Sequence, residues 1–378
     1  MKAIYLDHGA TTPIDDYVFQ SMLPFLKEHY GNPSSIHQMG IYAKRSINEA
    51  RAHVSEVLNC DQKQVVFTSG ATESINICLK GVSMHHAHKK KIITSTIEHS
   101  ASIMTLSHLE TLGVEVIYLD VNKEGLIDLD ELEKNMGPDV GLVSIIWVNN
   151  EIGTIQDIKA ISQICRKHKV LLHVDGVAAF GKLEVNLNDL QIDFLSLSAH
   201  KFYGPKGAGL LYVRECKEIS PCVFGGLQEN GLRSGTENMT GSIGLAAAMS
   251  LTAKRRTAYV KHLNDLTSAL KQALKDVPDI MFNEPHNKDS MIPGLLSISF
   301  KGITAHEMAY ELDKHQIYVS AGSACHSSHL DKSHVIKAIH KGLYEDYGTI
   351  RITFGKENIL SDISYIASCM ITAYEEII

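Results

Sequence analysis

Two side chains with catalytic potential stand directly after short apolar runs, at positions where buried strands would end. Asp175 follows residues 170–174, and Lys201 lies in a turn after residues 194–197. A carboxylate in such a place is costly to bury unless it meets a cation or a hydrogen-bond donor. A lysine in a turn is usually a surface residue, but here aromatic residues flank it, which makes it a candidate for a desolvated, nucleophilic amine. The pair indicates a site that combines an amine with a buried acid.

A third segment adds a possible binding site for phosphate. Residues 68–74 read Thr-Ser-Gly-Ala-Thr-Glu-Ser and lead from an apolar run into a helical pattern. Backbone N–H groups at a helix N-terminus bind anions. The segment is neither a Walker A loop nor a GxGxxG motif, so it does not indicate a nucleotide. Ordinary N-capping by Ser or Thr explains the segment equally well when it is taken alone.

One cofactor uses these features together. Pyridoxal phosphate needs a lysine for its Schiff base, an aspartate on its ring nitrogen and a cup for its phosphate. An aromatic or imidazole ring over the pyridine would hold it flat, and His99 follows the apolar run at residues 92–96. Each signal is weak alone. Their order on successive strands predicts a pyridoxal-phosphate site.

The elements that would position these residues form a repeating pattern. Near-continuous Val, Ile and Leu content predicts strands that are buried on both faces, as in a parallel sheet flanked by helices. The predicted strands are residues 64–68, 91–95, 114–119, 142–148, 170–174, 194–197 and 210–213. Residues 74–82 and 158–168 have the spacing of crossover helices. We predict an α/β fold with a mainly parallel, doubly wound sheet, whose ligands lie beyond the carboxyl ends of the strands.

The pattern changes in the last third of the chain, which predicts a second, smaller α+β domain. Residues 239–274 read as one or two long helices. The later predicted elements are strands at 295–300, 317–320 and 349–354 and helices at 305–314 and 359–378. We expect a large domain over residues 15–257, and a small domain built from residues 1–14 and 258–378.

Composition narrows the class of protein. The chain has 378 residues and a formal net charge of −7, which argues against a dedicated nucleic-acid or membrane-surface binder. Its apolar stretches are too short for a membrane span, and it opens without a signal peptide, so we expect a cytoplasmic protein. The seven cysteines contain no CxxC pair, which argues against zinc ribbons and disulfide frameworks. The His-rich residues 85–91 are expected to form a solvated loop, and we predict no metal site.

Taken together, these motifs resemble the cysteine desulfurases, a branch of the class V aminotransferase group of fold-type I pyridoxal-phosphate enzymes. The resemblance covers essentially the whole chain and is closest to the NifS/IscS type. Beyond the segments above, it rests on residues 5–13 (YLDHGATTP), 31–37 (GNPSSIH), 233–238 (RSGTEN) and 320–325 (SAGSAC).

The resemblance implies roles for the residues around the cofactor. Lys201 would hold it as a Schiff base, Asp175 would pair with its ring nitrogen, and His99 would stack on the ring and help to move protons. Asn150 would lie near its phenolic oxygen and the substrate. The phosphate contacts would come from Ala71, Thr72, Ser198 and His200. Thr236 would reach the phosphate of the partner subunit's cofactor, which implies a homodimer.

The same resemblance implies the reaction. L-cysteine would be converted to L-alanine, with Arg351 on its carboxylate and Cys325 as the nucleophile that becomes a persulfide. Cys325 follows small residues, 322–324, in a segment that could carry a thiol inward and then outward. The sulfur would pass to a sulfur-acceptor protein, either an iron–sulfur scaffold or a tRNA or cofactor thiolation enzyme.

One departure from the family pattern concerns the cofactor. The family usually has glutamine three residues after the aspartate, whereas this chain has Ala178. A methyl group cannot donate the hydrogen bond that the amide gives to the phenolic oxygen. We therefore expect a changed cofactor titration and a lower rate.

Three rival functions remain open from the sequence. An aminotransferase or a selenocysteine lyase would use the same scaffold, and the former would not need Cys325. A partner-binding pseudoenzyme is the third, with Ala178 as its only hint. The presence of Lys201, Asp175 and His99 argues against it.

Overall fold

Seven strands form the central sheet of the computed structural model, which describes residues 3–322, 333–341 and 346–378. The strand order is β2-β8-β7-β6-β5-β3-β4. Pairing is parallel throughout except at β8, which is antiparallel to both of its neighbours. The strands are β2 (Val65–Thr68), β3 (Lys91–Ser95), β4 (Glu115–Leu119), β5 (Val140–Ile146), β6 (Leu171–Asp175), β7 (Phe194–Ser198) and β8 (Gly209–Val213). The predicted mainly parallel sheet is confirmed.

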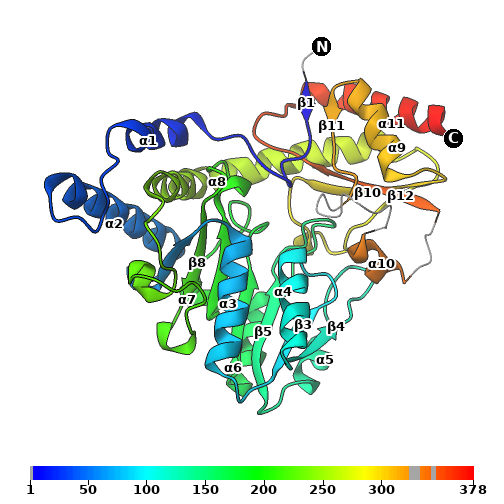
Figure 1. Ribbon diagram of the computed structural model, residues 1–378. Coiled ribbons are helices and arrows are strands. Elements are labelled where there is room, and N and C mark those ends of the chain that lie inside the picture. The colour runs from blue at the N-terminus through cyan, green and yellow to red at the C-terminus, as the bar shows by residue number, and fades with distance from the viewer. Residues whose placement is uncertain (1–2, 323–332, 342–345) are drawn as a thin grey trace.

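Helices cover both faces of this sheet (Figure 1). Every residue of β5, β7 and β8 is buried, which requires cover on both sides. Alternate residues of β2 and β8 enter two separate hydrophobic clusters, as the two-residue period of a strand dictates. The helices of this unit are α1 (Asp16–Lys27), α2 (Gln38–Leu58), α3 (Ala71–His85), α4 (Ser100–Thr111), α5 (Leu129–Lys134), α6 (Ile158–His168) and α7 (Leu187–Leu190).

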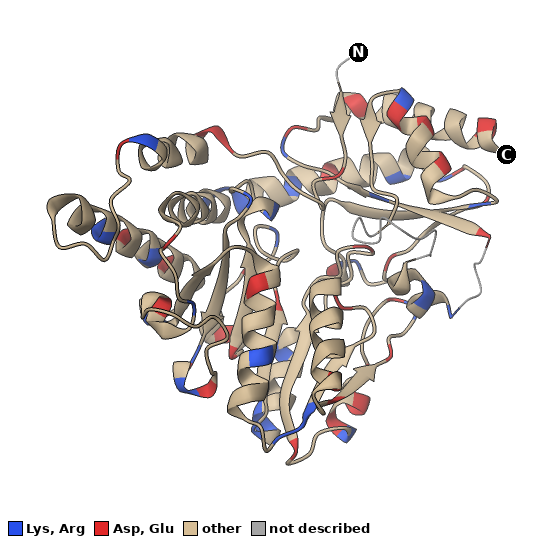
Figure 2. Ribbon diagram, viewed as in Figure 1, with Lys and Arg blue, Asp and Glu red and all other residues tan. Residues whose placement is uncertain are grey.

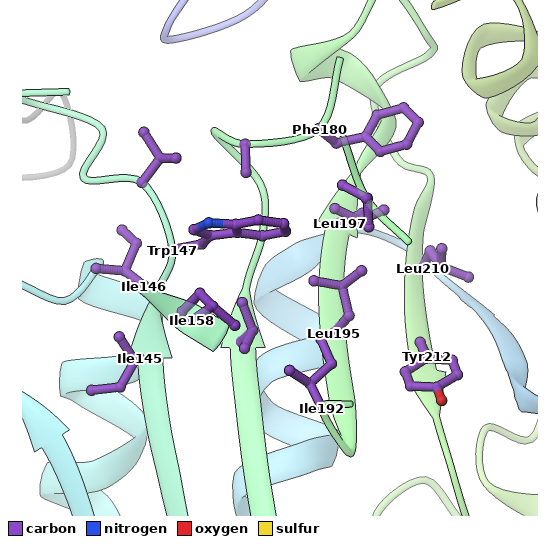
Figure 3. Packing of buried hydrophobic residues seen from close by; sticks show 14 of the residues in the cluster. Ile145, Ile146, Trp147, Ile158, Phe180, Ile192, Leu195, Leu197, Leu210 and Tyr212 are labelled. Atoms are coloured by element: carbon purple, nitrogen blue, oxygen red, sulfur yellow. The ribbon is translucent and has the colours of Figure 1, made fainter. Parts of the chain in front are cut away.

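The larger cluster lies on the face of the sheet that α6 covers. Ile158, Ile161 and Cys165 recur along one side of α6 and are buried there, as an amphipathic helix requires. Figure 3 shows Ile158 next to Trp147 and close to Leu195 on β7. This packing fixes the ends of β5 to β7, where the predicted site residues stand.

A second unit packs around its own hydrophobic cluster. In it, β10 (Leu295–Lys301) pairs antiparallel with both β9 (Ile280–Phe282) and β12 (Tyr347–Thr353), and β1 (Ile4–Tyr5) pairs parallel with β11 (Ile317–Tyr318). Helices α9 (Ala305–Lys314) and α11 (Ile363–Ile377) pack against these strands. The first strand and the last helix of the chain, β1 and α11, both lie in this unit (Figure 1).

A single long helix joins the two units. Helix α8 (Met239–Leu274) buries Leu245 and Met249 in the large cluster and Leu263 and Leu266 in the small one. This change of partner along one helix supports the predicted boundary at residues 257/258, which stays a prediction.

Helix α10 (His334–His340) belongs by its contacts to the large unit, although it lies late in the chain. Its Val335, Ile336 and Ile339 join the large cluster. Among the described residues, no helix is both long and apolar enough to cross a bilayer.

Candidate active site

A cavity of about 610 Å³ lies beyond the carboxyl ends of β5, β6 and β7, and β12 of the small unit contributes to its wall. It brings together almost all of the predicted site residues. Those that line it are Ala71, Thr72, His99, Asn150, Asp175, Ser198, His200, Lys201 and Arg351. The rule that ligands bind beyond the carboxyl ends of parallel strands led us to expect that these residues meet, and they line one cavity.

Lys201 enters the cavity from the short helical turn that follows β7. Its Nζ donates to the backbone oxygens of Gly9 at 2.6 Å and Ala10 at 3.0 Å. The N-terminal segment thus holds the amine, and it is fixed in turn by Thr12, whose Oγ1 donates to the His200 carbonyl. An amine placed in this way is positioned for a covalent cofactor bond.

Asp175 ends β6 at the base of the cavity and is only 3% exposed. Its Oδ1 accepts a hydrogen bond from the Val177 N–H at 3.0 Å. Burial raises the pKa of the Asp175 carboxyl, while His99, that N–H group and Lys201 oppose the rise. No lysine or arginine of the described chain forms an ion pair with it, so a cationic ligand group would compensate its buried charge.

His99 caps helix α4 and faces the same cavity. Its Nδ1 accepts from the Ala101 N–H at 3.1 Å, so the neutral ring carries its proton on Nε2. Burial lowers the pKa of the His99 ring, although the Asp175 charge opposes this. His99 therefore offers a neutral, oriented imidazole.

The N-terminus of α3 forms the predicted phosphate end. Gly70 is its N-cap and supplies no side-chain hydrogen bond to the first turn, which leaves N–H groups available for an anion. Ser198 and His200 line the cavity with Ala71 and Thr72. His200 Nδ1 lies 3.2 Å from the Thr11 hydroxyl, and burial lowers the pKa of its ring to about 4.

Arg351 lies on β12 and is 5% exposed. Its Nη1 donates to the Asn150 carbonyl and its Nη2 to Oδ1 of Asp7, both at 2.9 Å. Its Nε has no partner in the described part of the chain. The predicted carboxylate clamp therefore lies at the cavity, and Asp7 already neutralises part of its charge.

Two predicted residues do not line the cavity. Thr236 is exposed, in a segment that precedes α8. Cys325 lies outside the described residues. Its role and that of Thr236 stay predictions.

Several cavity residues escaped the sequence reasoning. They are Lys182, Glu98 and Glu151. Asp7 does not line the cavity, although it pairs with Arg351, which does. Glu98 is fully enclosed, and burial raises the pKa of its carboxyl to about 8, so it is mainly protonated at neutral pH. The sequence shows that Glu98 stands next to His99. Only its burial in the folded chain reveals that the pKa of its carboxyl is raised.

The His-rich segment differs in part from the expected loop. His85 ends α3, and His86 lies 3.1 Å from Glu218. Among the residues that the structure describes, no three His, Cys, Asp or Glu side chains are grouped to hold a metal ion.

The donor set of the cavity fits pyridoxal phosphate. It combines a lysine amine, a buried carboxylate without an ion pair among the described residues, an oriented imidazole and the N-terminus of a fifteen-residue helix. The lysine amine would hold the aldehyde carbon of the cofactor, and the carboxylate would hold its ring nitrogen. The imidazole would hold the ring face, and the helix N-terminus would hold the phosphate.

Comparison with known proteins agrees with this fit. The family model described as aminotransferase class-V matches residues 4–366. The chain is 40% identical to the cysteine desulfurase IscS of Dictyoglomus turgidum, over 96% of this chain and 92% of that protein. Among solved structures, a NifS-like protein has a TM-score of 0.92 at 38% identity and covers 98% of this chain and 99% of its own. Another solved structure, SspA in complex with cysteine, has a TM-score of 0.82 at 32% identity. The match covers 94% of this chain and 100% of that one.

Proposed function

The chain belongs to the aminotransferase class-V family as a pyridoxal-phosphate-dependent cysteine desulfurase, and from this premise we propose how its residues carry out the reaction. The observation that carries the proposal is the convergence of Lys201, Asp175 and Arg351 on one cavity. When bound, pyridoxal phosphate forms a Schiff base with an amine and withdraws electrons from the bonds at the amino-acid Cα.

Arg351 and Asn150 orient the substrate. The Arg351 guanidinium is a planar, permanently charged donor that suits the carboxylate of L-cysteine. Its contact with the Asn150 carbonyl holds it at the cavity wall. A carboxylate held there would leave the substrate amine able to approach Lys201, which lines the same cavity.

Lys201 then moves the protons at Cα. The Lys201 amine would remove the Cα proton and later return a proton to the product carbon. The Gly9 and Ala10 carbonyls, which accept from Nζ, keep the amine close to this position. Asp175 would hold the ring nitrogen of the cofactor and stabilise positive charge there, and His99 would hold the ring face.

Cys325 supplies the nucleophilic thiolate in this proposal. Its sulfur attacks the substrate sulfur, an S–S bond forms, and the substrate Cβ–S bond breaks with its electron pair left on the carbon skeleton, which is protonated and released as L-alanine. The described residues on either side of the segment that contains Cys325 support this role. The Ser320 backbone pairs with that of Arg351, and the Ser333 hydroxyl donates to the Glu151 carboxylate at the cavity. Cys325 stands three positions beyond Gly322, so an extended chain spans at most about 11 Å between them.

The other cysteines are poor candidates for this step. Burial raises the pKa of both Cys60 and Cys165 to about 12, and it also raises that of Cys78, Cys216 and Cys222. Cys369 is buried on α11. None of the six lines the cavity.

The proposal includes a homodimer in which Thr236 reaches the partner's phosphate site. Thr236 is exposed and lies away from the cavity of its own subunit. Large apolar side chains are exposed nearby in the chain at Phe224 and Leu227, which are 76% and 89% accessible. Such side chains favour burial against a second subunit.

We also propose that the persulfide sulfur passes to a thiol of an acceptor protein, an iron–sulfur scaffold or a tRNA thiolation enzyme. The cytoplasm suits this transfer because the Cys325 thiol must stay reduced.

The test is a mass measurement on the intact protein loaded with pyridoxal phosphate. After L-cysteine is added, Cys325 should gain one sulfur atom while an equal amount of L-alanine appears. Cys325→Ser should still change the absorbance of the cofactor with L-cysteine but form no persulfide, and Cys216→Ser should behave as wild type. Alanine production by Cys325→Ser at the wild-type rate would refute the assigned nucleophile. Conversion of the cofactor to its amine form by L-cysteine would indicate an aminotransferase instead.

A further inference from the structure

Lys182 is a cavity residue to which none of the roles above is assigned. It follows β6 in a tight turn, in which the Gly176 carbonyl accepts from Ala179 and Phe180 and the Ala179 carbonyl accepts from Lys182. The preceding Gly181 has φ +87°, and a Cβ there would lie 2.7 Å from Thr252 Cγ2. The backbone under Lys182 is therefore fixed by its surroundings.

The side chain of Lys182 lacks a counter-charge. In the described part of the chain it forms neither an ion pair nor a hydrogen bond, although it lines the cavity. Burial lowers the pKa of its amine to about 8, and the charges of Arg351 and Lys201 add to this effect. Its charge in turn helps to lower the pKa of His8 to about 4. Lys182 is half-buried, and a partly desolvated ammonium among cations is costly unless an anion binds beside it.

The neighbouring cations already have acceptors. Arg351 donates to Asp7 and Lys201 donates to two carbonyl oxygens. Outside the cavity, charges of both signs are interspersed along the fold (Figure 2). Lys182 is therefore a cation of the cavity that has no ion-pair partner among the residues that the structure describes.

The position of Lys182 favours the substrate end over the phosphate end. The groups that influence its charge are Arg351 on β12 and Lys201, and His8 feels its charge in return. Two of the predicted phosphate donors, Ala71 and Thr72, stand at the N-terminus of α3, whereas Arg351, whose charge acts on Lys182, is the predicted carboxylate-binding residue. An anion at Lys182 therefore lies on the side of the substrate carboxylate.

We propose that Lys182 is a second carboxylate-binding group of the substrate site, which acts with Arg351 to select amino acids that carry a free α-carboxylate. This proposal rests on the proposed function, because it assigns the residue to the same substrate. Asp7 neutralises part of the Arg351 charge, and Lys182 supplies the net positive charge that attracts the substrate carboxylate. The binding of that anion compensates the charge of the half-buried ammonium.

The test compares two ligands that differ only in this group. L-cysteine and L-cysteinamide share the amine and the thiol, but the amide carries no negative charge. Each is titrated anaerobically into the holoenzyme, and its half-saturating concentration is read from the absorbance of the bound cofactor. Lys182→Met should raise the value for L-cysteine about tenfold or more, while that for L-cysteinamide should change less than twofold.

Control variants separate charge from packing. Lys182→Arg keeps the charge and should stay within about threefold of wild type for L-cysteine, whereas Lys182→Gln should resemble Lys182→Met. Lys159→Met, on the exposed side of α6, should change neither ligand. If Lys182→Met does not fold, the Arg and Gln variants carry the comparison.

The outcomes distinguish this proposal from the proposed function. An equal loss for both ligands, or no loss for L-cysteine, would overturn the role of Lys182 while wild-type alanine formation still stood. If the wild-type protein forms no alanine from L-cysteine, the desulfurase function itself fails.

Discussion

The guanidinium Nη2 of Arg351 lies 2.9 Å from Oδ1 of Asp7, although 344 residues separate the two in the chain. Arg351 stands on β12, and Asp7 follows β1 in the N-terminal segment. Arg351 lines the cavity and Asp7, which does not line it, already pairs with its guanidinium, so a substrate carboxylate competes with Asp7 for the same cation. Asp7 therefore adjusts how strongly Arg351 attracts the substrate.

Replacing Asp7 tests this competition. Asp7→Asn keeps an oxygen acceptor for Nη2 but removes the negative charge, so more of the Arg351 charge is available to the substrate. We expect the half-saturating concentration of L-cysteine to fall about threefold with little change in kcat. Steady-state kinetics measures both quantities. A large rise in this concentration would show instead that the Asp7 charge is needed to aim the guanidinium.

Ala178 provides a second prediction, because it lines the cavity where the family usually has an amide. Ala178→Gln restores a donor toward the phenolic oxygen of the cofactor. We expect a shifted pH midpoint of the bound cofactor's absorbance and a turnover about tenfold higher. Ala178→Met adds similar bulk without a donor and should not reproduce the gain. If both properties stay unchanged in Ala178→Gln, the missing amide has no consequence here.

The buried His173 makes the stability of the fold depend on pH. Its ring lies 2.8 Å from the Ser144 hydroxyl and 2.9 Å from that of Ser196, and burial lowers its pKa from 6.5 to about 3. Between these values the unfolded chain binds a proton that the folded protein excludes. The free energy of unfolding therefore falls as the pH drops below 6.5, by up to about 1.4 kcal/mol per pH unit from this residue.

His173→Gln should remove this share of the pH dependence, whatever its effect on stability near neutral pH. Urea denaturation at several pH values between 4 and 7 measures the slope. His108→Gln, at an exposed position of α4, is the matched control and should leave the slope as in wild type. An unchanged slope in His173→Gln would contradict the assignment.

The ion pair between Arg51 and Glu229 predicts a large stability effect. Its N···O distance is 2.7 Å, and the side chains are only 15% and 3% exposed. Glu229 also accepts from the Phe67 N–H of β2 at 2.8 Å. Glu229→Ala leaves a buried arginine without its partner and should lower the free energy of unfolding by about 3 kcal/mol.

An exposed pair serves as the control for this prediction. Arg45 and Glu49 lie 3.6 Å apart on α2 with side chains that are 68% and 64% exposed. Glu49→Ala should cost about 0.5 kcal/mol or less. Denaturant titration compares the two variants, and equal losses would show that burial is not what makes the Arg51 pair strong.

Local sequence patterns were sufficient for much of the fold. The apolar run at residues 91–95 and the helical spacing at 158–168 and 305–314 coincide with β3, α6 and α9. Each of these signals depends on residues within one or two turns of each other, where side-chain period follows backbone geometry. Strand ends were less accurate, as at β5, because pairing with neighbouring strands decides where a strand stops.

The sequence by itself indicated which side chains would meet at the cofactor site: Asp175 ends a strand, Lys201 and His99 follow strands, and parallel strands bring their carboxyl ends to one edge. Only the tertiary structure decided which charged groups meet in the part of the cavity where the substrate carboxylate is expected to bind. The pairing of Arg351 with Asp7 and the placement of Lys182 beside them depend on how the small unit meets the large one. No local pattern encodes such contacts, because they join segments that are hundreds of residues apart and their charges depend on burial that only the folded chain creates.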